Sequence, residues 1–316
     1  MVVERLSEAG RPVVALARDP DGEAARALAA LPHVQVLKGD CNDLASLNAA
    51  MAGCAGVVAT YGCKPNRFSQ FSDLWTDPLS PEGDPKHQAT VLYRGMENVL
   101  AACKTHGVKK VVRLSGLASG FKPWNPILVL FCLVLSFTPR WARRAEDAIR
   151  KSGVDYTVIR APGLKDGAPA SVTCDYLVCA SDSWGENEEV PATSGIARAD
   201  IADLCCLALD EPGLQKATIR VSRARRPTAG SMYMMFDTRA KQTWTELVPS
   251  VVPDREQELR VNNWAYNLPV LAIVSGLTYL AGAVFSTLLA VVAYIFTVVW
   301  GTVWPAFCRL LLTLIG

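Results

Sequence analysis

The sequence has little of what a metal centre or a disulfide-stabilised fold requires. Its ten cysteines form no CxxC pair, and only three histidines accompany them, so the common zinc motifs are excluded. We therefore expect free thiols in a reducing compartment, with Cys205 and Cys206 on a buried helix. The histidines His33, His87 and His106 stand alone in the sequence and are expected in loops or turns.

The chain also lacks an excess of either charge. Its 32 lysines and arginines face 30 acidic residues, for a net charge of +2, which gives no case for nucleic acid as a partner. Half of the residues are apolar, which is high for a soluble enzyme, and this excess is concentrated in two segments.

The longer apolar segment has no charged residue between Arg260 and Arg309. A charge at the centre of a bilayer costs about 3 kcal/mol, and one spanning helix needs about 20 residues. We therefore expect two membrane spans, roughly 269–288 and 290–312, in a tight helical hairpin. The alternatives are a single tilted span followed by an interfacial helix, and a buried apolar appendage. Aromatic residues expected at the headgroup levels are Trp264, Tyr266, Trp300 and Trp304.

The shorter apolar segment, from Pro126 to Pro139, is too short to span a bilayer. One interpretation is a core helix or a lid over a pocket. The other is an apolar flap that rests on a membrane or covers a lipophilic substrate. The sequence leaves both interpretations open.

Outside these segments, strand and helix patterns alternate along the chain. Short apolar runs indicate strands at 12–18, 33–38, 55–62, 109–116, 154–163 and 217–222. Amphipathic stretches indicate helices at 2–9, 21–31, 44–53, 89–107, 140–153 and 197–212, the fifth with a basic, polar outer face.

This alternation predicts an α/β fold with a doubly wound parallel sheet, because crossover connections are right-handed. The predicted domains are a nucleotide-binding-type domain at 1–222, a linker at 223–267 and a transmembrane helical region at 268–316.

Three runs of the sequence together point to a family. They are NVLAACKTHGVKKVVRLSG, AEDAIRKSGVDYTVIRAPGL and SGIARADIADLCCLALDEP, in this order. They resemble the atypical short-chain dehydrogenase/reductases, and within them the NmrA-like and plastid NAD(P)-binding branch. The resemblance covers residues 1–222 and implies a Rossmann-like sheet, NADP or NAD as cofactor, and a plastid location.

The family begins with a strand and a GxxGxxG turn, directly before the helix that matches VVERLSEAG. Glycines let the backbone approach the cofactor pyrophosphate at that turn. This sequence contains no such motif, so the family's central first strand is expected to be missing. The strands at 12–18 and 55–62 would then flank an empty slot. We expect a truncated start that comes from an incomplete gene model; the alternative is a degenerate member that no longer binds dinucleotide.

The resemblance assigns part of a cofactor site near the first two strands of this chain. Arg18 ends a strand where a basic residue of the family meets the 2′-phosphate of NADP, which suits a guanidinium. Asp40, followed by Cys41 and Asp43, resembles the family turn that borders the adenine. The alternatives are a solvated surface arginine and an ordinary Asx turn or helix cap.

The remaining cofactor contacts implied by the resemblance lie at strand ends, where open α/β sheets bind their ligands. They are Ala59, Thr60, Tyr61 and Gly62 after one strand, Ser115 and Gly116 at the end of the next, and Pro162 and Gly163 beside the nicotinamide.

The chain departs from the family's usual chemistry in one respect. No tyrosine is followed by lysine four positions later, so the YxxxK pair of many short-chain dehydrogenases is absent. Catalytic residues therefore stay unassigned, and no metal is expected. Lys122 is the one nearby cation considered as a proton donor, and Arg160 is expected to be structural.

These features predict a membrane-anchored NAD(P)-binding oxidoreductase-like protein that acts on a lipophilic substrate, as a reductase or epimerase-type enzyme. One alternative is a non-catalytic NAD(P)-binding or assembly subunit of a membrane complex. Another is a membrane anchor with a decayed domain. The expected partners are the lipid membrane, the lipophilic substrate and subunits of a membrane complex.

Overall fold

The computed structural model divides the chain into two compact units, Met1–Tyr266 and Asn267–Gly316. The residues that it describes are 1–62, 84–121, 125–135, 137–166, 176–180, 195–223, 244, 248–251, 253–254 and 267–306. Residues 63–83 therefore lie outside the described residues, as do Lys122, Trp264 and Tyr266.

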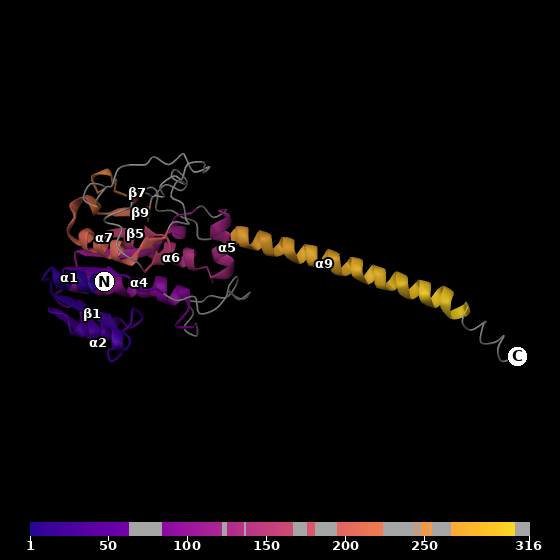
Figure 1. The fold of residues 1–316 in the computed structure, drawn as a ribbon, viewed down its shortest axis with the longest axis horizontal. Helices are drawn as coiled ribbons and strands as arrows, with labels where there is room; N and C mark the ends of the chain where they lie inside the picture. Colours follow the sequence, from indigo (N-terminus) through magenta and orange to yellow (C-terminus); the bar gives the residue numbers. More distant parts are fainter. Residues whose placement is uncertain are drawn as a thin grey trace. The chain divides into compact units, whose positions relative to one another are not determined.

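A five-stranded sheet forms the centre of the first unit (Figure 1). Its neighbouring strands are, in order, β3 (Gly56–Ala59), β4 (Lys110–Gly116), β5 (Asp155–Ala161), β9 (Ala217–Arg223) and β7 (Tyr176–Ala180). All neighbouring pairs are parallel except β7 with β9, which is antiparallel. The predicted parallel α/β sheet is confirmed.

The first two strands of the chain form a separate parallel pair, β1 (Val13–Ala17) with β2 (Val34–Lys38). In the part of the chain that the structure describes, no strand pairs with both β1 and β3. These are the two strands that were expected to flank a slot, and all five residues of β1 are only partly buried. A third small sheet pairs β6 (Leu164–Lys165) with β8 (Ile196–Ala197).

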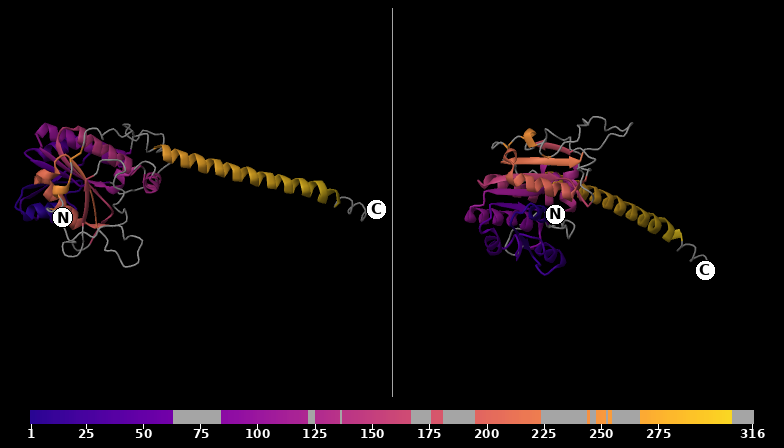
Figure 2. Two further views of the ribbon diagram at one scale, coloured as in Figure 1. Left: turned by 90° about the horizontal axis from the view of Figure 1, so that it is seen from above. Right: turned by 60° about the vertical axis from the view of Figure 1, so that its left-hand side comes forward.

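Helices cover both faces of the central sheet, and Figure 2 shows these layers from two further directions. One face carries α1 (Val2–Glu8) and α7 (Arg198–Asp210). The other carries α3 (Leu44–Met51), the π-helical segment η2 (Ala89–Arg94), α4 (Gly95–His106) and α6 (Thr138–Lys151). Shorter helical elements are α2 (Glu23–Ala29), η3 (Leu117–Gly120), α5 (Pro126–Val134), η5 (Pro212–Leu214) and η6 (Val248–Ser250).

Alternate residues of each strand supply the two apolar cores. Val112 and Ile159 pack with α7, whereas their neighbours Val111 and Val158 pack with α3, α4 and α6. This period of two arises because successive side chains of a strand point to opposite faces of a sheet. Both faces are therefore buried, as a doubly wound fold requires.

Helix α6 was predicted to carry basic and polar residues on its outer face, but several of its charged residues face inward. Its charged residues Arg143, Glu146, Asp147 and Arg150 are all buried. They recur at the i, i+3, i+4, i+7 spacing that marks one face of a helix, and that face turns inward. Burial is tolerated because these charges pair with one another and with neighbouring strands.

Part of the predicted linker 223–267 packs onto the first unit. Val248 and Val251 join the core that includes α7, and Trp244 packs against its edge. The carboxylate of Asp254 accepts hydrogen bonds from the Thr218 amide and hydroxyl at 2.9 and 2.6 Å. The chain is thus attached to the folded domain as far as residue 254.

The second unit contains one long helix, α9 (Asn267–Val298), followed by the π-helical segment η9 (Val299–Val303). The expected hairpin is not confirmed, because α9 is continuous through residues 288–290, where the turn was placed. The sequence there, LLAVVAY, contains no glycine, proline or charged residue that would end a helix. Phe296, Trp300 and Trp304 stack along one side of this helix.

The thiols and histidines follow the expectations in part. Cys41, Cys54, Cys103, Cys132, Cys205 and Cys206 are free, and burial raises the pKa of Cys103 to about 11 and of Cys132 and Cys205 to about 12. Such thiols are poor nucleophiles, as their structural interpretation requires. His87 lies in a bend but is buried, with its ring edge toward Trp141.

Candidate functional site

The residues predicted to contact a cofactor lie at the carboxyl ends of parallel strands. Arg18 directly follows β1, Asp40 follows β2, and Ala59 ends β3. Ser115 and Gly116 end β4, and Pro162 directly follows β5. They lie on two separate sheets, β1–β2 and the central sheet. Each of them thus lies at the carboxyl end of a parallel strand, which is the kind of position where open α/β sheets bind ligands.

In the turn after β2, one carboxylate oxygen of Asp40 holds the turn, and the other can accept a hydrogen bond from a ligand. Asp40 Oδ1 accepts from the Asn42 amide at 2.9 Å, which is the Asx turn that the sequence allowed. Within the described residues, Asp40 Oδ2 accepts no hydrogen bond and Arg18 has no ion-pair partner. Both groups therefore remain available to a ligand.

Cys41 and Asp43 of this turn are held by packing and by hydrogen bonds. Cys41 lies against Gly95, where an added Cβ would come within 2.8 Å of its sulfur. Its carbonyl accepts from Asn98 Nδ2 at 3.1 Å. Asp43 caps α3, because its Oδ1 accepts from the Ala45 amide at 3.0 Å. Local structure thus accounts for Cys41 and Asp43 without a cofactor.

The turn after β3 is held by an arginine that sequence reasoning missed. Arg113 of β4 donates to the carbonyls of Ala59 and Tyr61 at 3.3 and 3.0 Å. Its guanidinium also lies 4.4 Å from the centre of the Tyr61 ring. This arginine fixes the strand end that includes Thr60 and Gly62. Its position inside an apolar strand was the signal for a buried partner.

Ser115, at the end of β4, donates to a buried carboxylate. Its hydroxyl lies 2.6 Å from Glu146 Oε1, and Ser119 Oγ lies at the same distance from that oxygen. In contrast, an added Cβ at Gly62, Gly116 or Gly163 would have no heavy atom within 4 Å. Three neighbouring strand ends therefore present open backbone, which a ligand can approach closely.

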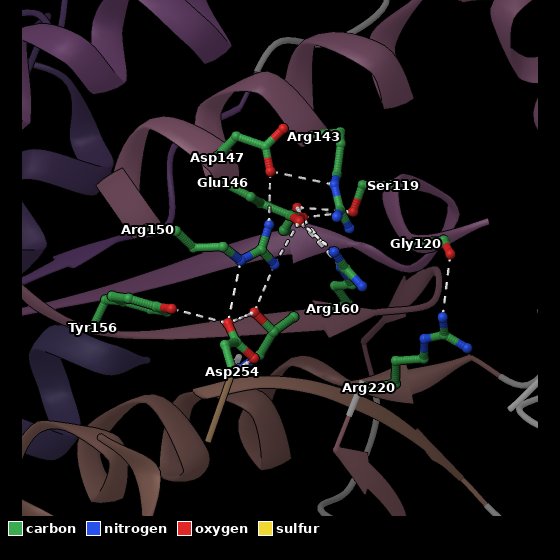
Figure 3. A network of polar contacts seen from close by, with 12 residues as sticks. Ser119, Gly120, Arg143, Glu146, Asp147, Arg150, Tyr156, Arg160, Arg220 and Asp254 are labelled. Carbon is green, nitrogen blue, oxygen red and sulfur yellow. Dashed lines mark hydrogen bonds and ion pairs between the residues drawn. The ribbon is translucent and has the colours of Figure 1, made fainter. Parts of the chain in front are cut away.

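Glu146 is the centre of the charged network that Figure 3 shows. Its Oε2 accepts from Arg160 Nη2 at 2.6 Å and pairs with Arg150 at 3.4 Å. Burial alone would raise the pKa of the Glu146 carboxyl, but Arg160 and Arg150 lower it well below its usual value. Glu146 is therefore a carboxylate that accepts hydrogen bonds, and Arg160 has the structural role that the sequence predicted.

The network continues to Asp254. Asp254 Oδ2 accepts from Arg150 Nε at 3.2 Å and from the Tyr156 hydroxyl at 3.0 Å. Farther along, Arg220 Nη2 donates to the Gly120 carbonyl at 3.1 Å (Figure 3). The charged residues of α6 recur at the spacing of one helical face. This spacing was the signal by which the network could have been found.

The arrangement fits part of a dinucleotide. Arg18 offers a guanidinium for a phosphate and Asp40 offers a carboxylate oxygen for an amine, while the glycines at the ends of β3, β4 and β5 leave room for a flat ring. The glycine-rich turn that would hold the pyrophosphate is not in the sequence. No cluster of metal-binding side chains occurs among the residues that the structure describes.

Comparisons with known proteins show the family to which the folded unit belongs. The NAD(P)H-binding domain family matches residues 1–212. A chloroplastic protein of Arabidopsis thaliana is 34% identical over 186 residues, which cover 55% of this chain and 51% of the relative. Sanguinarine reductase of Eschscholzia californica is 35% identical over 196 residues, which cover 56% of this chain and 67% of the relative. A second chloroplastic Arabidopsis protein is 27% identical and covers 72% of this chain and 73% of the relative.

Solved structures support the fold. A protein from Bacillus halodurans, described as an NAD-dependent epimerase/dehydratase, has a TM-score of 0.52 at 18% identity and covers 72% of this chain and 89% of its own. A short-chain dehydrogenase/reductase from Veillonella parvula, solved in complex with NADP, has a TM-score of 0.50 at 14% identity and covers 70% of this chain and 89% of its own. The chain spans about half the length of the first Arabidopsis relative. Because the family match covers most of the folded unit, the chain belongs to the NAD(P)H-binding Rossmann family, in its NmrA-like, atypical short-chain dehydrogenase/reductase group.

Proposed function

We propose that this protein is an NAD(P)-dependent reductase that helix α9 holds to a membrane and that acts on a lipophilic substrate. The observation that carries the proposal is α9 itself. Its segment Leu268–Val298 has 31 residues and a mean hydropathy of 2.1, and none of its most apolar window is buried. A core helix of this composition would be buried instead.

The dimensions of α9 support a membrane span. A helix of 31 residues is about 46 Å long, whereas the hydrocarbon core of a bilayer is about 30 Å thick. The helix is therefore long enough to cross with a tilt. Such an anchor keeps the first unit close to a bilayer, where apolar molecules concentrate.

The residues at the strand ends are proposed to hold NADP or NAD. Arg18 would bind the 2′-phosphate of NADP, and Asp40 Oδ2 would accept from the adenine amine. Thr60, Tyr61 and Gly62 would border the cofactor after β3, with Ala59 at the strand end. Ser115 and Gly116, with Pro162 and Gly163, would border the nicotinamide, which supplies a hydride when bound. Cys41 and Asp43 would shape the adenine side.

The relatives support the class of reaction and the compartment. One of them is named a reductase and two are named chloroplastic. We infer for this chain a reduction at a plastid membrane. Possible further partners are subunits of a complex in that membrane.

A second candidate is a non-catalytic NAD(P)-binding subunit of a membrane complex. The observation that favours it is the state of Ser115, whose hydroxyl proton is engaged by Glu146 at 2.6 Å. Together with the missing YxxxK pair, this leaves the β4 end without an obvious proton donor among the described residues. Such a subunit would bind the cofactor but would not oxidise it.

Titration of the full chain in nanodiscs separates these candidates. Binding is measured by NADPH and NADH fluorescence, and turnover by loss of absorbance with a quinone or isoprenoid acceptor. Cofactor oxidation supports the reductase, and tight binding without oxidation by these acceptors supports the subunit. Absence of binding contradicts both.

The variant Arg18→Gln tests the assigned cofactor contact. We expect it to weaken NADPH binding at least tenfold and to leave NADH binding unchanged, because only NADPH carries the 2′-phosphate. The matched control is Arg26→Gln on the exposed face of α2, which should change neither. Equal losses for both cofactors would contradict the role of Arg18.

A further inference from the structure

Helix α5 exposes apolar side chains on a folded domain that already has two apolar cores. Leu128, Val129 and Cys132 are buried, at 1%, 6% and 1% exposure, where α5 packs on α6 and η3. Leu130 and Phe131 are 54% and 36% exposed. Every residue of Pro126–Val134 is apolar, so the outward side of α5 has none of the polar residues that a water-facing helix carries.

The side chains that face outward lie on one side of the helix. Leu130 and Val134 are four residues apart, so they are stacked on the same face, and Phe131 lies three residues before Val134. Val134 is half-buried. Exposed apolar surface of this kind marks a site of contact with another apolar surface.

Basic side chains follow this apolar helix on the next element. Arg140 and Arg144 of α6 are one helical turn apart, and both are partly exposed. Their guanidinium groups lie 5.0 and 5.1 Å from the centre of the Trp141 ring. Trp141 is itself buried, at 4% exposure, so the partly exposed arginines are the groups of this cluster that can meet anionic headgroups, next to an apolar helix that packs on α6.

The chain itself limits how far this surface can be from a bilayer. Asp254 is fixed to the first unit by hydrogen bonds from Thr218, Arg150 and Tyr156. Only residues 255–266 separate it from α9, so the connection reaches at most about 45 Å even when fully extended. A tether this short gives a weak contact site a high effective concentration at the membrane.

We propose that α5 is a second membrane contact, which inserts Leu130, Phe131 and Val134 into the headgroup boundary of the bilayer that α9 crosses. The occupant of this apolar face is thus lipid. The inference rests on the membrane anchoring proposed above, and it adds a surface that orients the first unit on the bilayer. Helix α5 packs on η3, which directly follows β4, so this contact would keep the candidate site close to the lipid.

Photo-crosslinking of the full chain in nanodiscs tests the proposal. The nanodiscs contain phosphatidylcholine and phosphatidylglycerol at three to one. The photoreactive residue p-benzoylphenylalanine replaces Phe131 in one sample, Leu44 in a second and Phe285 in a third. Leu44 is the matched control, because it is an apolar residue of the first unit with 40% exposure on another helix, α3. Phe285 lies within α9 and reports the anchor.

We expect lipid adducts, measured by mass spectrometry, at positions 131 and 285, with at least tenfold less at position 44. Adducts at 285 without adducts at 131 overturn the α5 proposal and leave the anchor intact. No adducts at 285 contradict the anchor itself. Crosslinks from 131 to a second copy of the chain, in place of lipid, overturn the proposal in favour of a dimer.

Discussion

Glu146 is a fully buried residue that links several other buried groups. Its carboxylate accepts from two serines, pairs with two arginines and is fully buried. A buried ion pair is weak support for stability by itself, because desolvation offsets the attraction. Removing one partner is different, because the remaining charges stay buried without compensation.

We therefore expect Glu146→Gln to lower the free energy of unfolding by about 3–5 kcal/mol. The amide keeps the size of the side chain but removes the counter-charge that Glu146 gives Arg160, and one of the three carboxylates that pair with Arg150. Urea unfolding followed by tryptophan fluorescence measures the change. The control is Glu8→Gln, since the Glu8 side chain is 65% exposed in its pair with Arg5 and should contribute less than about 1 kcal/mol. Equal effects of the two variants would contradict the central role of Glu146.

The same carboxylate makes stability depend on pH in a defined direction. The pKa of Glu146 lies below its ordinary value of 4.5 in the folded protein. Its stabilisation is therefore fully present above pH 4.5 and is lost as the pH falls from there toward the folded pKa. Unfolding midpoints measured from pH 7 to pH 3.5 should fall more steeply for the natural chain than for Glu146→Gln. Parallel curves for the two chains would show that carboxyl groups other than Glu146 determine how stability depends on pH.

At the scale of single elements, α3 tests whether a predicted cofactor residue acts on the cofactor or on the fold. Asp43 caps this helix through the Ala45 amide. Asp43→Ala should cost about 1 kcal/mol of stability, whereas Asp43→Ser should restore most of it, since serine is also a good cap. NADPH affinity measured for both variants shows whether Asp43 also contacts the cofactor. Affinity that falls in Asp43→Ser, with stability retained, would show a direct cofactor contact.

The strands and helices were largely predictable because their signals are local. The apolar runs of β4 and β5 and the glycine-terminated α4 read directly from the sequence, and Gly107 does adopt the left-handed conformation at the end of α4. The partners of Arg113 and Glu146 were not predictable. A charged residue on an apolar face shows that a partner exists, but its identity depends on which strands become neighbours.

The hairpin prediction failed for a related reason. The length of the uncharged segment gave room for two spans, but length alone does not place a turn. Glycine and proline favour turns, and residues 286–295 contain neither, so nothing in this stretch favours the turn of a hairpin. The local sequence therefore favours one continuous helix over a turn at these residues.

For the whole molecule, one span and two spans give opposite topologies. A single α9 that crosses the bilayer places the first unit and the residues after Val303 on different sides of the membrane. A hairpin would return the chain to the same side. With epitope tags at both ends of the full chain in sealed liposomes, added protease should therefore remove one tag and spare the other.

The protease experiment needs a control for membrane insertion. A tag is protected from the protease only if α9 is inserted in the bilayer. Ala283→Arg places a charge near the middle of α9 and should cost about 3 kcal/mol of insertion, whereas Ala283→Leu should have no such effect. We expect the natural chain and Ala283→Leu to stay in the membrane pellet at alkaline pH, and Ala283→Arg to be extracted in larger part. If both tags are cleaved or both are spared in a pelleted chain, the single span is wrong. If the natural chain is itself extracted, α9 does not cross the bilayer, and the reductase or binding activity must be explained without a membrane.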